Sequence, residues 1–134
     1  MSQAAPSRLD RLRERLSQRL LVTSLTNIRY LTGFESSNAA LLVDPRGPVT
    51  LFTDSRYIEA AEAVAGVEAV LTTRSLTLDL ASRLRGKLAF EADHLPFAQV
   101  DRLGSGGLEL VPSNGAVEAR PAADVRRELE RLIA

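Results

Sequence analysis

The sequence contains no cysteine, no tryptophan and a single histidine among its 134 residues. The lack of cysteine excludes a disulfide framework, a thiolate nucleophile and a thiolate metal ligand. An excess of charge of one sign is also lacking, because Lys plus Arg and Asp plus Glu balance at 17 each. A balanced chain has no overall attraction for nucleic acid or for an anionic membrane, and we expect neither as a partner.

Long hydrophobic runs are missing as well. No apolar segment approaches the roughly 20 residues that a membrane-spanning helix needs. The N-terminal stretch MSQAAPSRLDRLRERL is polar and charged where a secretory signal would carry an apolar run. We therefore expect a cytoplasmic protein.

What the chain does contain is typical of one globular domain spanning residues 1–134. Hydrophobic residues make up 45% of the chain and charged residues 25%, which is an ordinary balance for a domain with a single core. Short apolar runs predict strands at 20–24, 39–44, 49–54, 67–73, 87–92 and 108–113. Segments of helical periodicity lie before, between and after them, and the first carries Leu9, Leu12, Leu16 and Leu20 on one face. With one hairpin turn at 45–48, this order predicts a layered α/β domain built on a mixed sheet.

The stretch SLTNIRYLTGF at 24–34 predicts a short helix with defined ends. Thr26 is the expected N-cap, and Leu25 and Tyr30 are expected to form a hydrophobic staple across it. Gly33 is expected to end the helix in the left-handed conformation. A second cap, Asp54 or Ser55, is expected before a helix that Gly66 ends.

The last predicted helix begins at Pro121 and has no Gly, Asn or Pro stop signal before Ala134. Its apolar stripe consists of Val125, Leu129, Leu132 and Ile133. We interpret this unfinished helix as the sign of a longer parent protein, in which part of the stripe would be covered by another segment.

No catalytic centre is evident in the sequence. The single histidine, His94, has no partner at a spacing typical of a metal or catalytic motif, and a structural or solvated role is favoured. Four carboxylates follow predicted strands: Asp44, Asp54, Glu91 and Asp93. Together they could hold two divalent ions for phosphodiester cleavage, whereas in the alternative Asp44 and Asp54 are turn and cap residues and Glu91 is a surface charge. The absence of a basic surplus favours the alternative.

Five motifs in register nevertheless resemble a known family. They are NIRYLTGF (27–34), AALLVD (39–44), LFTDSRY (51–57), FEADHL (90–95) and LVPSNGAVEARPAADV (111–125). In this order they are similar to the N-terminal domain of the creatinase, prolidase and Xaa-Pro aminopeptidase family, over essentially the whole chain. The resemblance implies a six-stranded mixed sheet flanked by helices, of ribonuclease H-like topology.

The same resemblance implies a division of labour within a larger protein. Residues 120–134 would begin the helix that links this domain to a C-terminal catalytic domain of the "pita-bread" type. That missing domain would hold two divalent metal ions, manganese, cobalt or zinc, so no catalytic or metal-binding residue is expected in this chain and no cofactor. The parent would be a homo-oligomer, with a dimer expected.

The resemblance also singles out the loop after the 27–34 helix, which in the family reaches towards the active site of a neighbouring subunit. By position, the candidate substrate-gating residues are Phe34, Glu35, Ser36, Ser37 and Asn38. The candidate supporting or interface residues are Tyr30, Asp54, Arg56 and Tyr57. We expect Tyr30 mostly buried, Phe34 partly exposed, and 36–38 at the surface near the carboxyl edge of the sheet.

Three classes of function therefore remain open from the sequence. The favoured one is a non-catalytic domain of a Xaa-Pro metallopeptidase that serves oligomer assembly and substrate gating in trans. The second is a free-standing binding or interaction module of the same fold. The third, disfavoured by the charge balance, is a metal-dependent nuclease.

Overall fold

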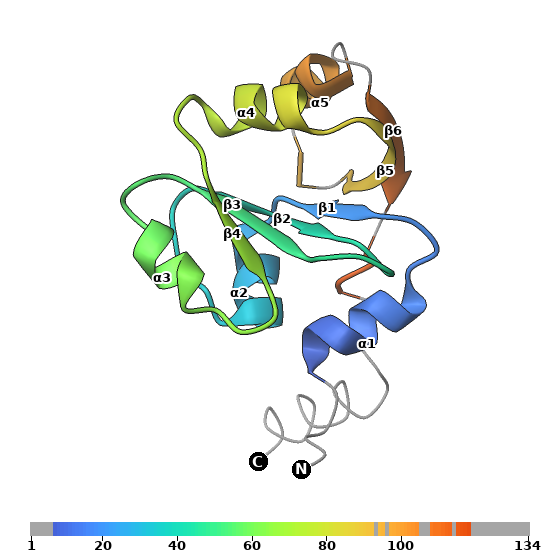
Figure 1. Cartoon of the computed structure of the whole chain (residues 1–134). Coiled ribbons are helices and arrows are strands. Elements are labelled where there is room, and N and C mark those ends of the chain that lie inside the picture. Colours follow the sequence, from blue (N-terminus) through green and yellow to red (C-terminus); the bar gives the residue numbers. More distant parts are fainter. Residues whose placement is uncertain (1–6, 93, 96, 105–107, 114, 119–134) are drawn as a thin grey trace, which may run out of the picture.

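The computed structural model describes residues 7–92, 94, 95, 97–104, 108–113 and 115–118. The predicted last helix, its apolar stripe and Asp93 lie outside these residues. The described part forms a single sheet with helices on both faces (Figure 1).

The sheet has six strands in the order β4-β3-β2-β1-β5-β6. Their bounds are β1 Leu20–Val22, β2 Ala39–Val43, β3 Thr50–Thr53, β4 Glu68–Leu71, β5 Gly86–Glu91 and β6 Leu108–Ser113. The pairs β1–β2 and β2–β3 are antiparallel, and the pairs β3–β4, β1–β5 and β5–β6 are parallel. The predicted six-stranded mixed sheet with one hairpin is therefore confirmed.

Helices cover each face of this sheet. The helices α1 (Arg8–Arg15), α2 (Leu25–Thr32) and α3 (Ile58–Glu62) lie on one face, and α4 (Leu76–Arg83) and α5 (Phe97–Gly104) lie on the other (Figure 1). The two-residue period of a strand divides the core accordingly. Leu20 and Val22 of β1 pack with α1 and α2, whereas Leu21 packs with α4 and α5.

Helix α1 is shorter than the leucine spacing predicts. It is opened by a capping box between Ser7 and Asp10, and it ends at Arg15 because Leu16 is already extended, with φ −83° and ψ 134°. Leu20 therefore belongs to β1 and not to the helix. Leu20 continues the leucine spacing of the helix only by chance, because it lies in the strand that follows.

Helix α2 begins two residues earlier than expected. Ser24 is the N-cap, since its hydroxyl accepts a hydrogen bond from the backbone N–H of Asn27, so Thr26 is not the cap. Leu25 becomes the first helical residue and is 39% exposed, which rules out the predicted staple with Tyr30. Within the helix, Ile28 and Leu31 are the large apolar side chains that pack into the core. Gly33 ends the helix with φ +78°, as predicted.

Helix α3 also begins differently. It starts after Tyr57 without any side-chain cap, so neither Asp54 nor Ser55 caps it. The carboxylate of Asp54 instead accepts from the backbone and side chain of Arg56. The helix itself is short, Ile58–Glu62, and Ala61 is its residue in the core.

Candidate functional site

The candidate loop lies at the edge of the sheet where three strands end. Because β1, β3 and β5 run in one direction and β2 runs against them, the carboxyl ends of β1, β3 and β5 meet the amino end of β2. Residues 34–38 lead from α2 into β2 at this edge. In open α/β sheets this edge is the usual position of ligands.

The side chain of Phe34 does not project from the loop. It is only 4% exposed and belongs to the core cluster beneath α2. Its ring meets the ring of Tyr57 edge to face, with centroids 6.4 Å apart. The expectation of a partly exposed Phe34 is therefore wrong. The left-handed Gly33 and a hydrogen bond from Phe34 N to Thr32 Oγ1 (3.1 Å) turn the ring inward.

Asp54 holds the far end of the loop. Its Oδ2 accepts from Asn38 Nδ2 at 2.9 Å, and both of its oxygens accept from the guanidinium of Arg56. The hydrogen bonds from Arg56, and then that from Asn38, hold the pKa of Asp54 well below its ordinary value of 3.8. Asp54 is therefore ionised at any neutral pH. Thr53 adds a hydrogen bond from its hydroxyl to the carbonyl of Asn38.

Tyr57 contacts the middle of the loop. Its hydroxyl lies 2.8 Å from Ser37 Oγ, and this hydrogen bond lowers the pKa of the phenol. The guanidinium of Arg56 lies 5.1 Å from the ring centroid of Tyr57, within cation–π distance. Tyr57 thus joins Phe34 below the loop to Ser37 above it.

The remaining loop residues differ in exposure. Glu35 is exposed and forms an ion pair with Arg29 at 2.9 Å. Ser37 is exposed, and Ser36 and Asn38 are half-buried. Tyr30 is half-buried where we expected it mostly buried, and the Arg8 guanidinium lies 4.3 Å from its ring centroid.

A network of polar side chains that the sequence did not reveal lies at the same edge. Glu91, at the end of β5, is only 5% exposed, and its Oε1 accepts from the backbone N–H groups of Thr23 and Ser24 at 2.7 and 2.9 Å. These N–H groups open α2, where a negative charge is stabilised. The expectation that Glu91 is a surface charge is therefore wrong. Its spacing from its partners, more than 60 residues along the chain, gave no local signal.

Asn27 extends this network to a second carboxylate. Its Nδ2 donates to Glu91 Oε2 at 2.6 Å and to Glu118 Oε1 at 2.7 Å, and His94 Nε2 lies 2.8 Å from the same Glu118 oxygen. Desolvation alone would raise the pKa of Glu118, but the hydrogen bonds from Asn27 and His94 outweigh it and lower that pKa. His94 is thus part of this hydrogen-bonded network.

Within the described residues, the one set with ligand types and spacing suited to a metal ion is Glu91, His94 and Glu118, whose ligating atoms lie within 4.8 Å of one another. However, the amide nitrogen of Asn27 lies between the two carboxylates and donates to both. A donor in that position holds the two carboxylates together by hydrogen bonds without bringing a net charge. The arrangement is that of a closed polar network joining α2, β5 and residues 117–118.

The carboxylates considered for a nuclease do not converge. Asp44 follows β2, which runs against β1 and β3, so Asp44 lies at the opposite edge from Asp54 and Glu91. Its Oδ1 accepts from the backbone N–H groups of Arg46 and Gly47, as a turn residue does. The two-metal arrangement therefore lacks Asp44, one of its four expected carboxylates.

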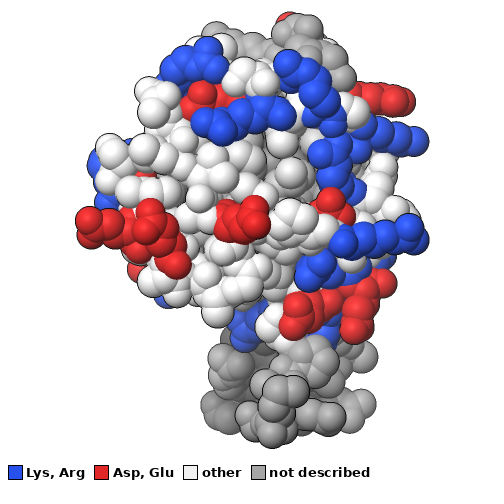
Figure 2. All heavy atoms as spheres, in the orientation of Figure 1, with Lys and Arg blue, Asp and Glu red and all other residues white. Residues whose placement is uncertain are grey.

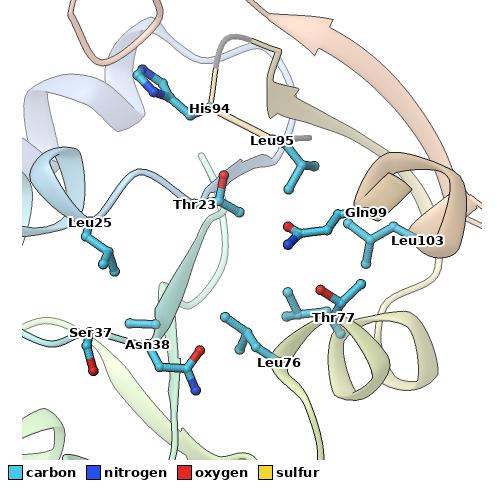
Figure 3. A pocket seen from close by; sticks show the side chains of 12 residues that line it. Thr23, Leu25, Ser37, Asn38, Leu76, Thr77, His94, Leu95, Gln99 and Leu103 are labelled. Carbon is cyan, nitrogen blue, oxygen red and sulfur yellow. The ribbon is translucent and has the colours of Figure 1, made fainter. Parts of the chain in front are cut away.

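A cleft of about 230 Å³ opens beside the network, between α2 and the pair α4–α5 (Figure 3). Its walls come from the end of β1, the start of α2, residues 37–39, the start of α4, residues 94 and 95, and α5. Leucines make up most of the apolar wall, and hydroxyl and amide groups make up the polar part.

The face of the molecule in Figure 2 carries charges of both signs. Lys and Arg side chains gather along the top and the right side, and Asp and Glu side chains lie at the left, near the centre and at the lower right, so neither sign covers the whole face. Within the described part of the chain, none of the helices combines the length and the hydropathy needed to span a bilayer.

Comparisons with known proteins agree with this architecture. The family model for the creatinase/prolidase N-terminal domain matches residues 8–120. No curated protein sequence matches the chain. With most of the chain covered by the family model and by the sheet described above, the protein belongs to the creatinase/prolidase N-terminal domain family.

Solved structures of related domains support the same assignment. The N-terminal domain of the cytoplasmic peptidase PepQ from Mycobacterium tuberculosis H37Rv is 32% identical, with a TM-score of 0.75, and covers 86% of this chain and 98% of that one. The N-terminal domain of a metallopeptidase from Corynebacterium diphtheriae is 34% identical, with a TM-score of 0.68, over 81% of this chain and 98% of that one.

A longer protein shares the fold. The Xaa-Pro dipeptidase from Bacillus anthracis is 22% identical, with a TM-score of 0.75, and the match covers 89% of this chain but only 37% of that one. A domain of this fold has thus been solved by itself, and the same fold forms the smaller part of a longer Xaa-Pro dipeptidase.

Proposed function

We propose that this chain serves as the non-catalytic N-terminal domain of a metal-dependent Xaa-Pro peptidase, where it takes part in oligomer assembly and gates substrate in trans. The observation that carries the proposal is the family membership, established over residues 8–120. The Bacillus anthracis dipeptidase, of which the match covers 37%, supports a second domain as the partner. That domain would hold the two divalent ions, manganese, cobalt or zinc, and perform the hydrolysis.

The loop at 34–38 is the part of this domain to which we assign the gating role. A gating loop has to present polar groups without losing much entropy when substrate binds. Three contacts from the domain hold this loop: the Phe34 ring beneath it, Asp54 on Asn38, and Tyr57 on Ser37. With Phe34 buried, the groups left to face a neighbouring subunit are Glu35 and Ser37.

A cytoplasmic location accompanies this proposal. The Mycobacterium tuberculosis relative is described as a cytoplasmic peptidase. The balanced charge of the chain supports the same location, since it offers no general attraction to a membrane surface.

Subunit mixing in the parent protein tests the gating role. We expect Glu35→Ala combined with Ser37→Ala to lower kcat/KM for a Xaa-Pro peptide by roughly tenfold, which corresponds to about 1.4 kcal/mol. Glu59→Ala, an exposed change on α3 away from the loop, is the matched control and should leave kcat/KM unchanged.

The mixed oligomers decide whether the loop acts in trans. Subunits with an inactivated catalytic domain and an intact loop are mixed with active subunits that carry the altered loop. Recovery of activity in the mixture supports action in trans. Activity that never exceeds that of the loop variant alone, or a parent protein that sediments as a monomer, would overturn the proposal.

A further inference from the structure

The cleft between α2 and the α4–α5 pair lies at the point where the sheet reverses its winding. Strand β1 continues through α2 on one face to β2, while its neighbour β5 continues through α5 on the other face to β6. The two connections leave in opposite directions, and this divergence opens a crevice at the carboxyl ends of β1 and β5. The 230 Å³ cleft occupies that crevice.

Polar groups without partners line the cleft. The hydroxyl of Thr77 and the side-chain amide of Gln99 make no hydrogen bond with any described residue, and the Gln99 amide points into the cleft (Figure 3). The buried hydroxyl oxygen of Thr23, at the base of the cleft, likewise has no partner among the described residues. A ligand in the cleft can hydrogen-bond with these groups in place of solvent.

The charge around the cleft disfavours an anionic ligand. Among the lining residues that the structure describes there is no Lys, Arg, Asp or Glu. The backbone N–H groups of Thr23 and Ser24, immediately before α2, bind the carboxylate of Glu91, which disfavours a second negative charge at this helix start. His94 is the only titratable residue among the described ones that line the cleft, and its ring turns away from it (Figure 3). These features favour an uncharged ligand.

The remaining wall is aliphatic. Leu25, Leu76 and Leu95 face the space, and Leu25 is 39% exposed although it is a large apolar side chain. The volume exceeds the roughly 150 Å³ in which an engineered protein cavity accommodates benzene. The cleft therefore has room for an aliphatic side chain between the leucines, and Thr77 and Gln99 line the same space.

We propose that this cleft binds an uncharged peptide segment in extended form, with an aliphatic side chain against Leu25 and Leu76 and its backbone amides on Thr77 and Gln99. A single residue of a peptide carries both an aliphatic side chain and the backbone amide groups that form hydrogen bonds. The inference stands apart from the gating role, because binding is measured on this chain alone and needs no catalytic domain. Relatives solved as isolated N-terminal domains support such a measurement.

A titration followed by backbone amide NMR tests the proposal. The probe is the blocked tripeptide acetyl-Ala-Leu-Ala-amide, added to the 134-residue chain. We expect saturable shifts at Thr23, Leu25, Thr77 and Gln99, with a dissociation constant on the order of 1 mM, as suits a small ligand in a shallow site. The same peptide with a free carboxylate in place of the terminal amide should bind more weakly.

Two leucines of similar exposure, 39% for Leu25 and 46% for Leu78, provide the matched variants. Leu25→Ala, inside the cleft, should weaken binding about tenfold, whereas Leu78→Ala, on α4 outside the cleft and 46% exposed, should not change it. Gln99→Ala, an exposed change, should weaken binding several-fold without unfolding the chain. The proposal is overturned if no saturable shifts occur, if they map away from the cleft, or if the two leucine variants weaken binding equally.

Discussion

The ring of Phe34 stands edge-on against the ring of Tyr57, with an interplanar angle of 85° and the centroids 6.4 Å apart. This contact joins the second residue after α2 to the residue that precedes α3, across 23 positions of the sequence. It makes Phe34 a core residue that supports the candidate loop from below. Several consequences for stability can be measured directly.

Replacing Phe34 should mainly destabilise the fold. Phe34→Ala removes a 4% exposed ring from the core, and we expect a loss of about 3–5 kcal/mol in the free energy of unfolding. Phe34→Leu keeps most of the volume and should lose less than about 1.5 kcal/mol. Urea denaturation of the 134-residue chain measures both. A loss below about 1 kcal/mol for the alanine variant would mean that the ring is not buried in solution.

A second prediction concerns the amide that joins two carboxylates. Asn27→Asp would place a third carboxylate between Glu91 and Glu118, and we expect it to cost at least about 2 kcal/mol at pH 7. Thr26→Asp is the matched control, because it adds the same charge to the same first turn of α2, where the helix dipole favours it. That variant should be neutral or slightly stabilised.

The pH dependence of the Asn27→Asp variant follows from the crowding of like charges. The introduced carboxyl has a higher pKa in the folded state than in the unfolded state, so the folded state binds more protons between these two values. The variant should therefore lose stability as pH rises from about 4 towards 7, relative to the parent chain. Denaturation series at several pH values would reveal this, and parallel curves for the two proteins would contradict the proximity of the three groups.

Asp54 should give the opposite dependence. Its folded-state pKa lies below the ordinary value of 3.8, because Arg56 and Asn38 stabilise the carboxylate. The stabilisation is present above that ordinary value and is lost as pH falls below it towards the folded-state pKa. The difference in stability between the parent chain and Asp54→Asn should thus shrink in acid. NMR titration of the carboxyl carbon measures the pKa itself, and Arg56→Gln should return it towards 3.8.

The left-handed turn at Gly33 should resist substitution for reasons of backbone conformation alone. At φ +78° a Cβ would meet nothing within 4 Å, so the expected cost of Gly33→Ala, about 1–2 kcal/mol, comes from the φ angle. Gly104→Ala is the comparison, since that glycine lies in α5 without a positive φ and also faces open space. There the same change should stabilise the chain by up to about 1 kcal/mol. Thermal unfolding of both variants checks the difference in sign.

The order of the elements and the class of the fold could be predicted from the sequence because they depend on local patterns. The uninterrupted apolar runs LLV and AALLV and the PRGP turn between 43 and 50 are each contained within a few residues. Gly33 was predictable in the same way, since only glycine adopts its φ without cost. Choosing between Ser24 and Thr26 as the cap was not possible locally, because both residues cap helices well.

By itself, the sequence thus determined the strands, the hairpin, the alternation of helices and the absence of thiol chemistry, all of which rest on composition or on neighbours along the chain. Only the tertiary structure decided that Phe34 faces inward, that Asp44 lies at the far edge, and that Glu91 binds the start of α2. Each of these depends on which strands pair and in which direction. Asn27 meets Glu91 and Glu118 across 64 and 91 positions, and no local pattern carries information over such separations.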